Sequence, residues 1–176
     1  MALDDVSQMP VDENTVTRFV TDLVRGFNTH DPDLFTSVMT DDVVFEHSGA
    51  PTTLYGRGQV GGYYTTVWTA IPDLTLELAD GPFFHPRAPR VSFAWAAAGT
   101  HTGPLDPPGL APTGKDVEFD VREIIEFRGG LASHVRVSTD MAEFARQIGA
   151  LPARGSVGER AGARMQRLQM KASRRR

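Results

Sequence analysis

Two long segments of alternating polar and apolar residues, joined by a pair of glycines, constrain the fold of this chain most. Residues 115–127 and 131–140 alternate with the two-residue period of a strand, and Arg128-Gly129-Gly130 between them is typical of a hairpin turn. Two more strand-like segments, residues 74–78 and 90–101, precede them. The second half of the chain is therefore predicted to form an antiparallel sheet.

The part of the chain ahead of these strands shows the period of helices. One helix is predicted after Asp12, a second from Asp31-Pro32, and a third over residues 59–70, where Pro72 stops it. A short strand is predicted over residues 43–47. Helices followed by hairpin-linked strands indicate an α+β fold. We expect a cone-shaped, curved antiparallel sheet with three N-terminal helices on its concave side, enclosing a pocket.

Composition limits the class of protein. A chain of 176 residues most naturally forms one domain, and without cysteine it forms neither disulfides nor thiolate metal sites. No apolar run approaches the ~18 residues of a membrane helix, and residues 1–10 lack the pattern of a signal peptide. We therefore expect a cytoplasmic protein with a flexible N-terminus over residues 1–10, one domain over residues 11–151 and a basic tail over residues 152–176.

Charge is divided unevenly along the chain. Residues 153–176 contain eight Lys or Arg and one Glu, a balance of +7, whereas the rest contains 10 basic and 21 acidic residues, a balance of −11. An acidic body argues against a nucleic-acid-binding domain, which would carry a basic face. The tail alone can contact a polyanion, or it forms a helix that packs across a partner subunit through Met165 and Leu168.

The predicted hairpin carries its charges mainly on one face. The apolar set of residues 117–127 is interrupted once, by Glu123, and pairing around the glycine turn brings the polar sets of both strands together. We interpret that face as a solvated outer surface with salt bridges. Asp140 stands where the last strand ends and a short helix begins. It is either the N-cap of that helix or a carboxylate in the wall of the cone, with a pKa raised by an apolar setting.

His101 and His47 are further candidates for the pocket. Each alternates with apolar residues on one side of its strand. The alternative interpretation is that each histidine belongs to the core or to a dimer interface. The histidines show no close metal-ligand pair, and the glycines of residues 56–61 do not lie in a strand–helix–strand unit. The sequence therefore predicts neither a metal site nor a cofactor. Aromatic residues that can form pocket walls or core are Tyr63, Tyr64, Trp68 and Trp95.

The order of these motifs resembles the SnoaL-like polyketide cyclase and ester cyclase family, within the nuclear-transport-factor-like superfamily of cone-shaped α+β barrels. The similarity extends over residues 11–151. The matching segments are Phe27-Asn28-Thr29-His30-Asp31, Asp41-Asp42-Val43-Val44, Gly56 to Gly58, Ile71-Pro72-Asp73-Leu74, Gly99-Thr100-His101-Thr102-Gly103, Pro112-Thr113-Gly114-Lys115, and Asp140 ahead of Phe144-Ala145-Arg146-Gln147-Ile148-Gly149.

The resemblance implies a cofactor-free pocket for a hydrophobic small molecule and a homodimer packed through the outer face of the sheet. It implies that Asp140 is the acid-base of a cyclisation or isomerisation of a polyketide-like carbonyl substrate, and that His101 or His47 polarises the carbonyl group. We expect Tyr64, Trp68, Trp95 and Arg136 to line the pocket. Arg136 lies in a strand where the family often has an aromatic residue. The alternative is a non-catalytic protein of the same fold that binds a small ligand or serves in assembly.

Overall fold

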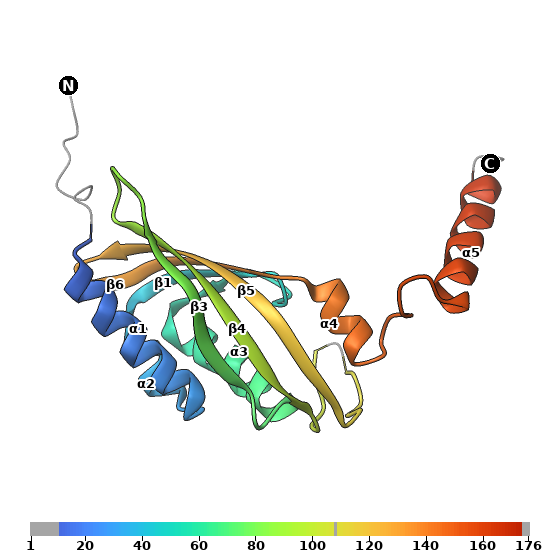
Figure 1. Cartoon of the computed structure of the whole chain (residues 1–176), viewed down its shortest axis with the longest axis horizontal. Helices are drawn as coiled ribbons and strands as arrows, with labels where there is room; N and C mark the ends of the chain where they lie inside the picture. Colours follow the sequence, from blue (N-terminus) through green and yellow to red (C-terminus); the bar gives the residue numbers. More distant parts are fainter. Residues whose placement is uncertain (1–10, 108, 174–176) are drawn as a thin grey trace.

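The computed structural model describes residues 11–107 and 109–173 (Figure 1). The segment predicted to be a flexible N-terminus, residues 1–10, lies outside the described residues. Three helices come first: α1 (Glu13–Asn28), α2 (Pro32–Thr36) and α3 (Gly56–Ala70). Their starts follow the local signals of the sequence, because Asp12 accepts a hydrogen bond from the amide of Thr15 and Asp31 accepts from those of Asp33 and Leu34.

The strands form one curved sheet of six. They are β1 (Met39–His47), β2 (Leu54–Tyr55), β3 (Thr75–Phe84), β4 (Arg90–His101), β5 (Lys115–Arg128) and β6 (Leu131–Thr139), in the order β2-β1-β6-β5-β4-β3. The predicted α+β fold and the predicted hairpin between β5 and β6 are confirmed. One detail differs from an antiparallel sheet, since β1 pairs with β6 in parallel. No hairpin joins these two strands, so no turn dictates their relative direction.

The helices α1, α2 and α3 cover one face of the sheet (Figure 1). Apolar side chains on that face are buried beneath them, and Phe19 of α1 packs on Phe93 and Phe127 with ring centroids 6.1 and 5.1 Å apart. Along β5 the buried positions alternate with exposed ones, as the pattern predicts. Every second residue of β5, including Glu123, therefore faces the inside of the sheet.

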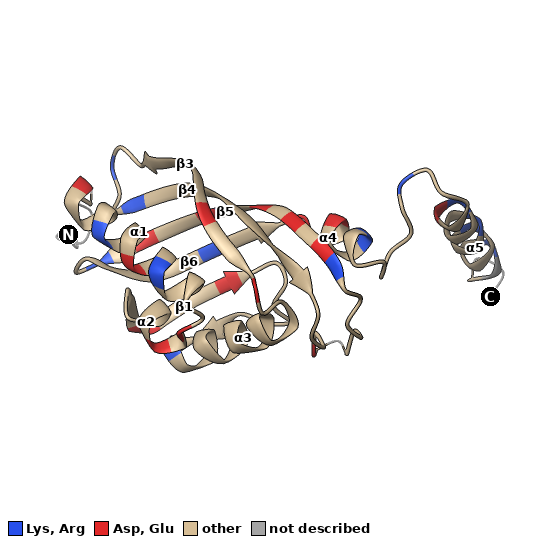
Figure 2. Cartoon of the chain, turned by 60° about the horizontal axis from the view of Figure 1, so that its bottom comes forward, with Lys and Arg blue, Asp and Glu red and all other residues tan. Residues whose placement is uncertain are grey.

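The opposite face of the sheet carries ion pairs, as the sequence indicates. Arg90 of β4 pairs with Glu126 of β5, and Arg136 of β6 pairs with Glu46 of β1 at 2.9 Å. Figure 2 shows charged positions along these strands. These residues are scaffold on the outer face.

Two helices follow the sheet, α4 (Met141–Gln147) and α5 (Val157–Ser173). Phe144 of α4 packs edge-on against Phe119 of β5, with ring centroids 5.7 Å apart. The helix α5 projects away from the rest of the chain (Figure 1). None of the helices that the structure describes combines the length and the apolar character needed to cross a membrane.

Candidate functional site

A cavity of about 540 Å³ lies between α3, the inner face of the sheet and α4. Its volume falls within the usual range for small-molecule sites. Most of its lining is apolar, and it includes no Lys or Arg among the described residues. The side chains with polar groups or aromatic rings in the lining are Phe27, Phe35, His47, Gln59, Tyr63, Tyr64, Thr66, Trp95, Phe119, Glu123, Thr139 and Phe144.

Glu123 is the carboxylate of this cavity. It is 7% exposed, and its Oε2 accepts a hydrogen bond of 2.8 Å from the indole Nε1–H of Trp95. Burial raises the pKa of Glu123 from 4.5 to about 7, although the hydrogen bond from Trp95 acts in the opposite direction. A carboxyl group with such a pKa is present in both protonation states near neutral pH. It can therefore both accept and return a proton there.

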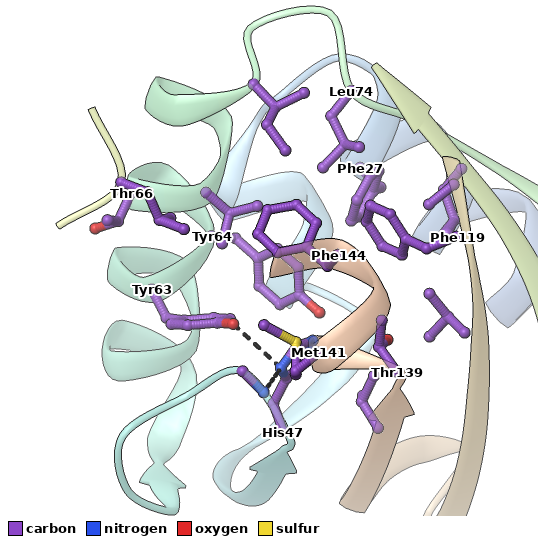
Figure 3. Close-up of a pocket in the computed structure, with 18 of the residues that line it drawn as sticks. Phe27, His47, Tyr63, Tyr64, Thr66, Leu74, Phe119, Thr139, Met141 and Phe144 are labelled. Atoms are coloured by element: carbon purple, nitrogen blue, oxygen red, sulfur yellow. Dashed lines mark hydrogen bonds between the residues drawn. The ribbon is translucent and has the colours of Figure 1, made fainter. Parts of the chain in front are cut away.

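Tyr64 brings a neutral hydrogen-bond donor to the same cavity. Its pKa is raised, mainly by burial and further by the nearby Tyr63 and Glu123. The phenol therefore stays protonated at neutral pH and can donate to an oxygen that gains negative charge. Figure 3 shows Tyr64 and Tyr63 projecting from α3 toward the side of the cavity where His47 and Thr139 lie.

His47 is held as a neutral ring with a defined tautomer. The amide N–H of Gly49 donates to its Nδ1 at 2.8 Å, and the Tyr63 hydroxyl lies 3.1 Å from the same nitrogen (Figure 3). Burial lowers the pKa of His47 from 6.5 to about 4. Because Nδ1 accepts, the ring proton of the neutral form belongs on Nε2. His47 therefore offers an N–H donor, as Tyr64 offers an O–H donor.

Two segments that follow sheet strands add apolar side chains to the cavity lining. Leu105, Pro107 and Leu110 contribute from the loop after β4, and Leu105 and Leu110 form a two-residue bridge. Met141 and Phe144 contribute from α4. These apolar side chains limit the access of water to the polar groups inside.

The structure separates Asp140 from the cavity. Its Oδ1 accepts the amide N–H of Glu143 at 2.9 Å, its side chain is 60% exposed, and Arg154 lies 3.7 Å from Oδ2. Asp140 is thus the N-cap of α4, which was one of its two interpretations, and it is absent from the lining. The Asp140 carboxylate therefore faces solvent and the start of α4, and it does not face the cavity.

His101 is also outside the lining. It is fully buried, and its Nδ1 lies 3.1 Å from the hydroxyl of Thr113. Its backbone carbonyl accepts the amides of Thr113 and Gly114, so His101 holds the two ends of the loop after β4 together. His101 is therefore a core residue in this structure, and only His47 of the two candidate histidines reaches the cavity.

Two of the four residues expected to line the pocket do so. Tyr64 and Trp95 line it, whereas Trp68 and Arg136 do not. Trp68 is 5% exposed and packs with Phe27, and its ring stacks on His30 with centroids 5.2 Å apart. Arg136 belongs to the outer parity of β6, because the inner parity is that of Val135 and Val137.

Glu123 is the residue that the assignment from sequence missed. Its signal in the sequence is a single carboxylate among the alternating apolar residues 117–127 of β5. The other members of that set are all buried or partly buried. An acidic residue on the buried face of a strand needs a hydrogen-bond partner or a raised pKa. Glu123 has both. Among the described residues, no three His, Asp or Glu side chains are grouped so that they could hold a metal ion.

Comparison with solved structures supports the fold. TsrD from Streptomyces laurentii superposes with a TM-score of 0.67 at 19% identity, covering 80% of this chain and 99% of its own. AclR from Streptomyces galilaeus, described as a candidate hydroxylase, has a TM-score of 0.65 at 19% identity over 92% of this chain and 98% of its own. IdmH from Streptomyces antibioticus, described as a candidate polyketide cyclase, has a TM-score of 0.60 at 21% identity over 76% and 97%. The names of these relatives span more than one reaction, so the shared fold does not define the chemistry.

Sequence comparison identifies the family. No curated protein gives a significant match to the chain. The sequence model of a family described as SnoaL-like polyketide cyclase matches residues 14–148, which extend from α1 to the end of α4 and contain every side chain of the cavity. The chain therefore belongs to the SnoaL-like polyketide cyclase family.

Proposed function

We propose that the protein is an enzyme that cyclises or isomerises a hydrophobic, carbonyl-bearing small molecule of the polyketide type, with Glu123 as its acid-base. The observation that supports this most directly is a buried carboxyl group with a pKa of about 7 in the wall of an apolar cavity. Family membership supports the reaction class. The role that the resemblance gave to Asp140 passes to Glu123, since Glu123 lines the cavity and Asp140 does not.

The proposed reaction begins with proton abstraction. The carboxylate of Glu123 removes a proton from the carbon next to the substrate carbonyl, and the electron pair of that C–H bond forms an enolate. In a cyclisation, the enolate carbon attacks a second carbonyl carbon of the same molecule. The new C–C bond leaves an alkoxide, which takes the proton back from Glu123. In an isomerisation, Glu123 returns the proton to a different carbon of the conjugated enolate.

Two neutral donors are available to the oxygen that gains charge. The Tyr64 hydroxyl keeps its proton because its pKa is raised, and His47 presents its Nε2–H because Nδ1 is occupied by the Gly49 amide. Neutral donors suit an enolate, because they stabilise the developing charge and do not themselves lose a proton to it. The apolar lining strengthens these hydrogen bonds by excluding water.

The first test isolates the proton-abstraction step. We expect the protein to catalyse exchange of the α-protons of 2-tetralone, a neutral aromatic ketone, for solvent deuterium, as followed by proton NMR. Exchange should rise with pH and level off above about 7, because the base is the ionised form of Glu123. Glu123→Gln should lower the rate by about 100-fold or more, the usual range for loss of a general base.

Matched variants make the test specific. Glu126→Gln removes a carboxylate from the outer face of the same strand and should leave the exchange rate unchanged. Asp140→Asn should also leave it unchanged if the proton is handled by Glu123. Binding of 2-tetralone without exchange would instead favour a ligand-binding protein of this fold. Exchange that persists in Glu123→Gln and disappears in Asp140→Asn would overturn the assignment.

A further inference from the structure

The helix α5 is a complete amphipathic helix without a packing partner in the described chain. Ser156 accepts the amide of Glu159 at 3.2 Å, and the Glu159 carboxylate accepts the amide of Gly155 at 2.6 Å, so the helix has a capping arrangement of its own. Its apolar side chains are largely solvent-exposed, including Met165 at 61% and Leu168 at 65%. Most of the stability of helices in proteins comes from packing of their amphipathic face, so a surface that covers this face would stabilise α5.

Apolar and basic residues form two adjacent stripes along α5. Val157, Ala161, Met165 and Leu168 recur every three or four residues and therefore share one face. Arg160, Arg164, Arg167 and Lys171 recur in the same way, one position ahead of the apolar set, and so line one edge of that face. We call these the apolar stripe and the basic stripe. Within the described residues, none of the four cations forms an ion pair.

The linker before α5 directs the helix away from its own domain. Arg154 contacts Glu143 at 3.0 Å and Asp140 at 3.7 Å, and the amide of Leu151 donates to the carbonyl of Ala145 at 2.9 Å. The linker is thus fastened to α4, and α5 extends from it into solvent (Figures 1 and 2). A surface for α5 on a second copy of the chain fits this arrangement better than one on the same copy.

The outer face of the sheet has a strip that matches both stripes. Ala96 and Ala98 of β4 face outward, and they pair with Asp120 and Glu118 of β5. Ala94, the next outward position, is buried and pairs with Arg122, so the accessible strip extends from residue 96 to residue 100. A hollow of about 430 Å³ lies at this end of the strip, lined by Ala98, Gly99, Thr100, Asp116, Val117, Glu118 and Gln147. We call this surface the alanine strip. It offers two small apolar side chains beside Asp116, Glu118 and Asp120, and Figure 2 shows acidic positions on β5 near α4. Asp120 also lies 3.6 Å from Arg122 of its own strand, and both side chains are exposed.

The dimensions also agree. The apolar stripe, residues 157–168 of α5, extends about 18 Å, and the strand from residue 96 to residue 100 extends about 16 Å. From this match of length, polarity and charge, we infer that α5 docks on the alanine strip of a second copy. The apolar stripe lies on the alanines, Met165 or Leu168 enters the hollow, and the basic stripe faces Asp116, Glu118 and Asp120. The acceptor is this chain itself, because its body carries the net negative charge that complements the tail.

Engineered cysteines test the contact directly, since the chain has none of its own. Met165→Cys in one tagged population and Ala98→Cys in another, mixed and mildly oxidised, should give a disulfide between differently tagged chains. Gln166→Cys is the matched control, because it stands next to Met165 in sequence but off the apolar stripe. It should give markedly less of the mixed product. A disulfide that forms only when both cysteines are in one chain would overturn docking between copies.

Charge reversal and truncation complete the test. Arg164→Glu with Arg167→Glu should raise the dissociation constant of the dimer about tenfold or more, as judged by analytical ultracentrifugation. Adding Glu118→Arg and Asp120→Arg should restore it, whereas Arg18→Glu on α1 should have no effect. A dimer that is unchanged when residues 153–176 are removed, held by the sheets alone, would contradict the inference. So would a monomeric full-length chain, or a tail that binds only anionic vesicles.

Discussion

Replacing Glu123 by Gln should change the pH dependence of stability in a defined direction. In the folded protein the pKa of Glu123 is about 7, against 4.5 for an unburied glutamate. The folded state therefore holds a proton that the unfolded state has lost between these two pH values. Linkage requires that the free energy of unfolding falls as pH rises from about 4.5 to about 7 and then levels off.

The size of this effect follows from the two pKa values. A difference of about 2.5 pH units corresponds to about 3 kcal/mol of destabilisation at pH 8 and above. A glutamine has no charge to bury, and its amide oxygen can still accept the Trp95 N–H. At pH 5, Glu123→Gln and the parent should be nearly equal in stability. At pH 8, the variant should be more stable by up to about 3 kcal/mol.

The assay is urea unfolding of both proteins at several pH values between 5 and 9, followed by tryptophan fluorescence. The informative quantity is the difference in unfolding free energy between variant and parent, because most other titrations cancel in it. Glu126→Gln is the control, and its difference from the parent should not show a rise between pH 5 and 8. A difference for Glu123→Gln that is constant with pH, or that grows toward acid, would refute the raised pKa.

Three further predictions test other parts of the structure. His47→Gln should be more resistant to acid than the parent in urea unfolding. Burial lowers the pKa of His47 from 6.5 to about 4, so the free energy of unfolding of the parent falls by up to about 3 kcal/mol as pH drops through this range. Trp95→Phe removes the hydrogen bond that lowers the pKa of Glu123, so the midpoint of 2-tetralone exchange should move above about 7; an unmoved midpoint would contradict this. Gly103→Ala places a Cβ 1.9 Å from the carbonyl oxygen of Thr69 and should lower the melting temperature, whereas Gly58→Ala, with open space around it, should not.

Local signals in the sequence account for most of the fold. Asp12 and Asp31 cap helices as expected, Pro72 follows the end of α3, and the glycines at 129 and 130 turn between β5 and β6 with positive φ. Each of these features depends on a few neighbouring residues. The direction of β1 does not, because it is decided by contacts with a strand about 90 residues later in the chain, as the pairing of Phe45 with Val135 shows.

The candidate site was harder to predict because a strand pattern identifies faces, not hollows. The alternation of β5 places Glu123 on the inner face, but whether that face is packed or open depends on how α3 and α4 lie above it. Asp140 illustrates a related difficulty. A carboxylate at a strand–helix junction meets the requirement of an N-cap and that of an exposed catalytic group equally well in sequence. Only the cavity lining distinguishes them.

The parallel pairing of β1 and β6 has a consequence for how the chain assembles during synthesis. The strand β1 lies between the two-residue β2 and β6, and β6 is the last strand of the sheet to be made. Until it emerges, one full edge of β1 and the facing edge of β5 have unpaired backbone groups, and β1 is not joined to the rest of the sheet. The domain should therefore complete its folding late and cooperatively, with the basic C-terminal segment still being added behind it. A chain that stops before β6 should be prone to aggregation and have no stable half-folded form.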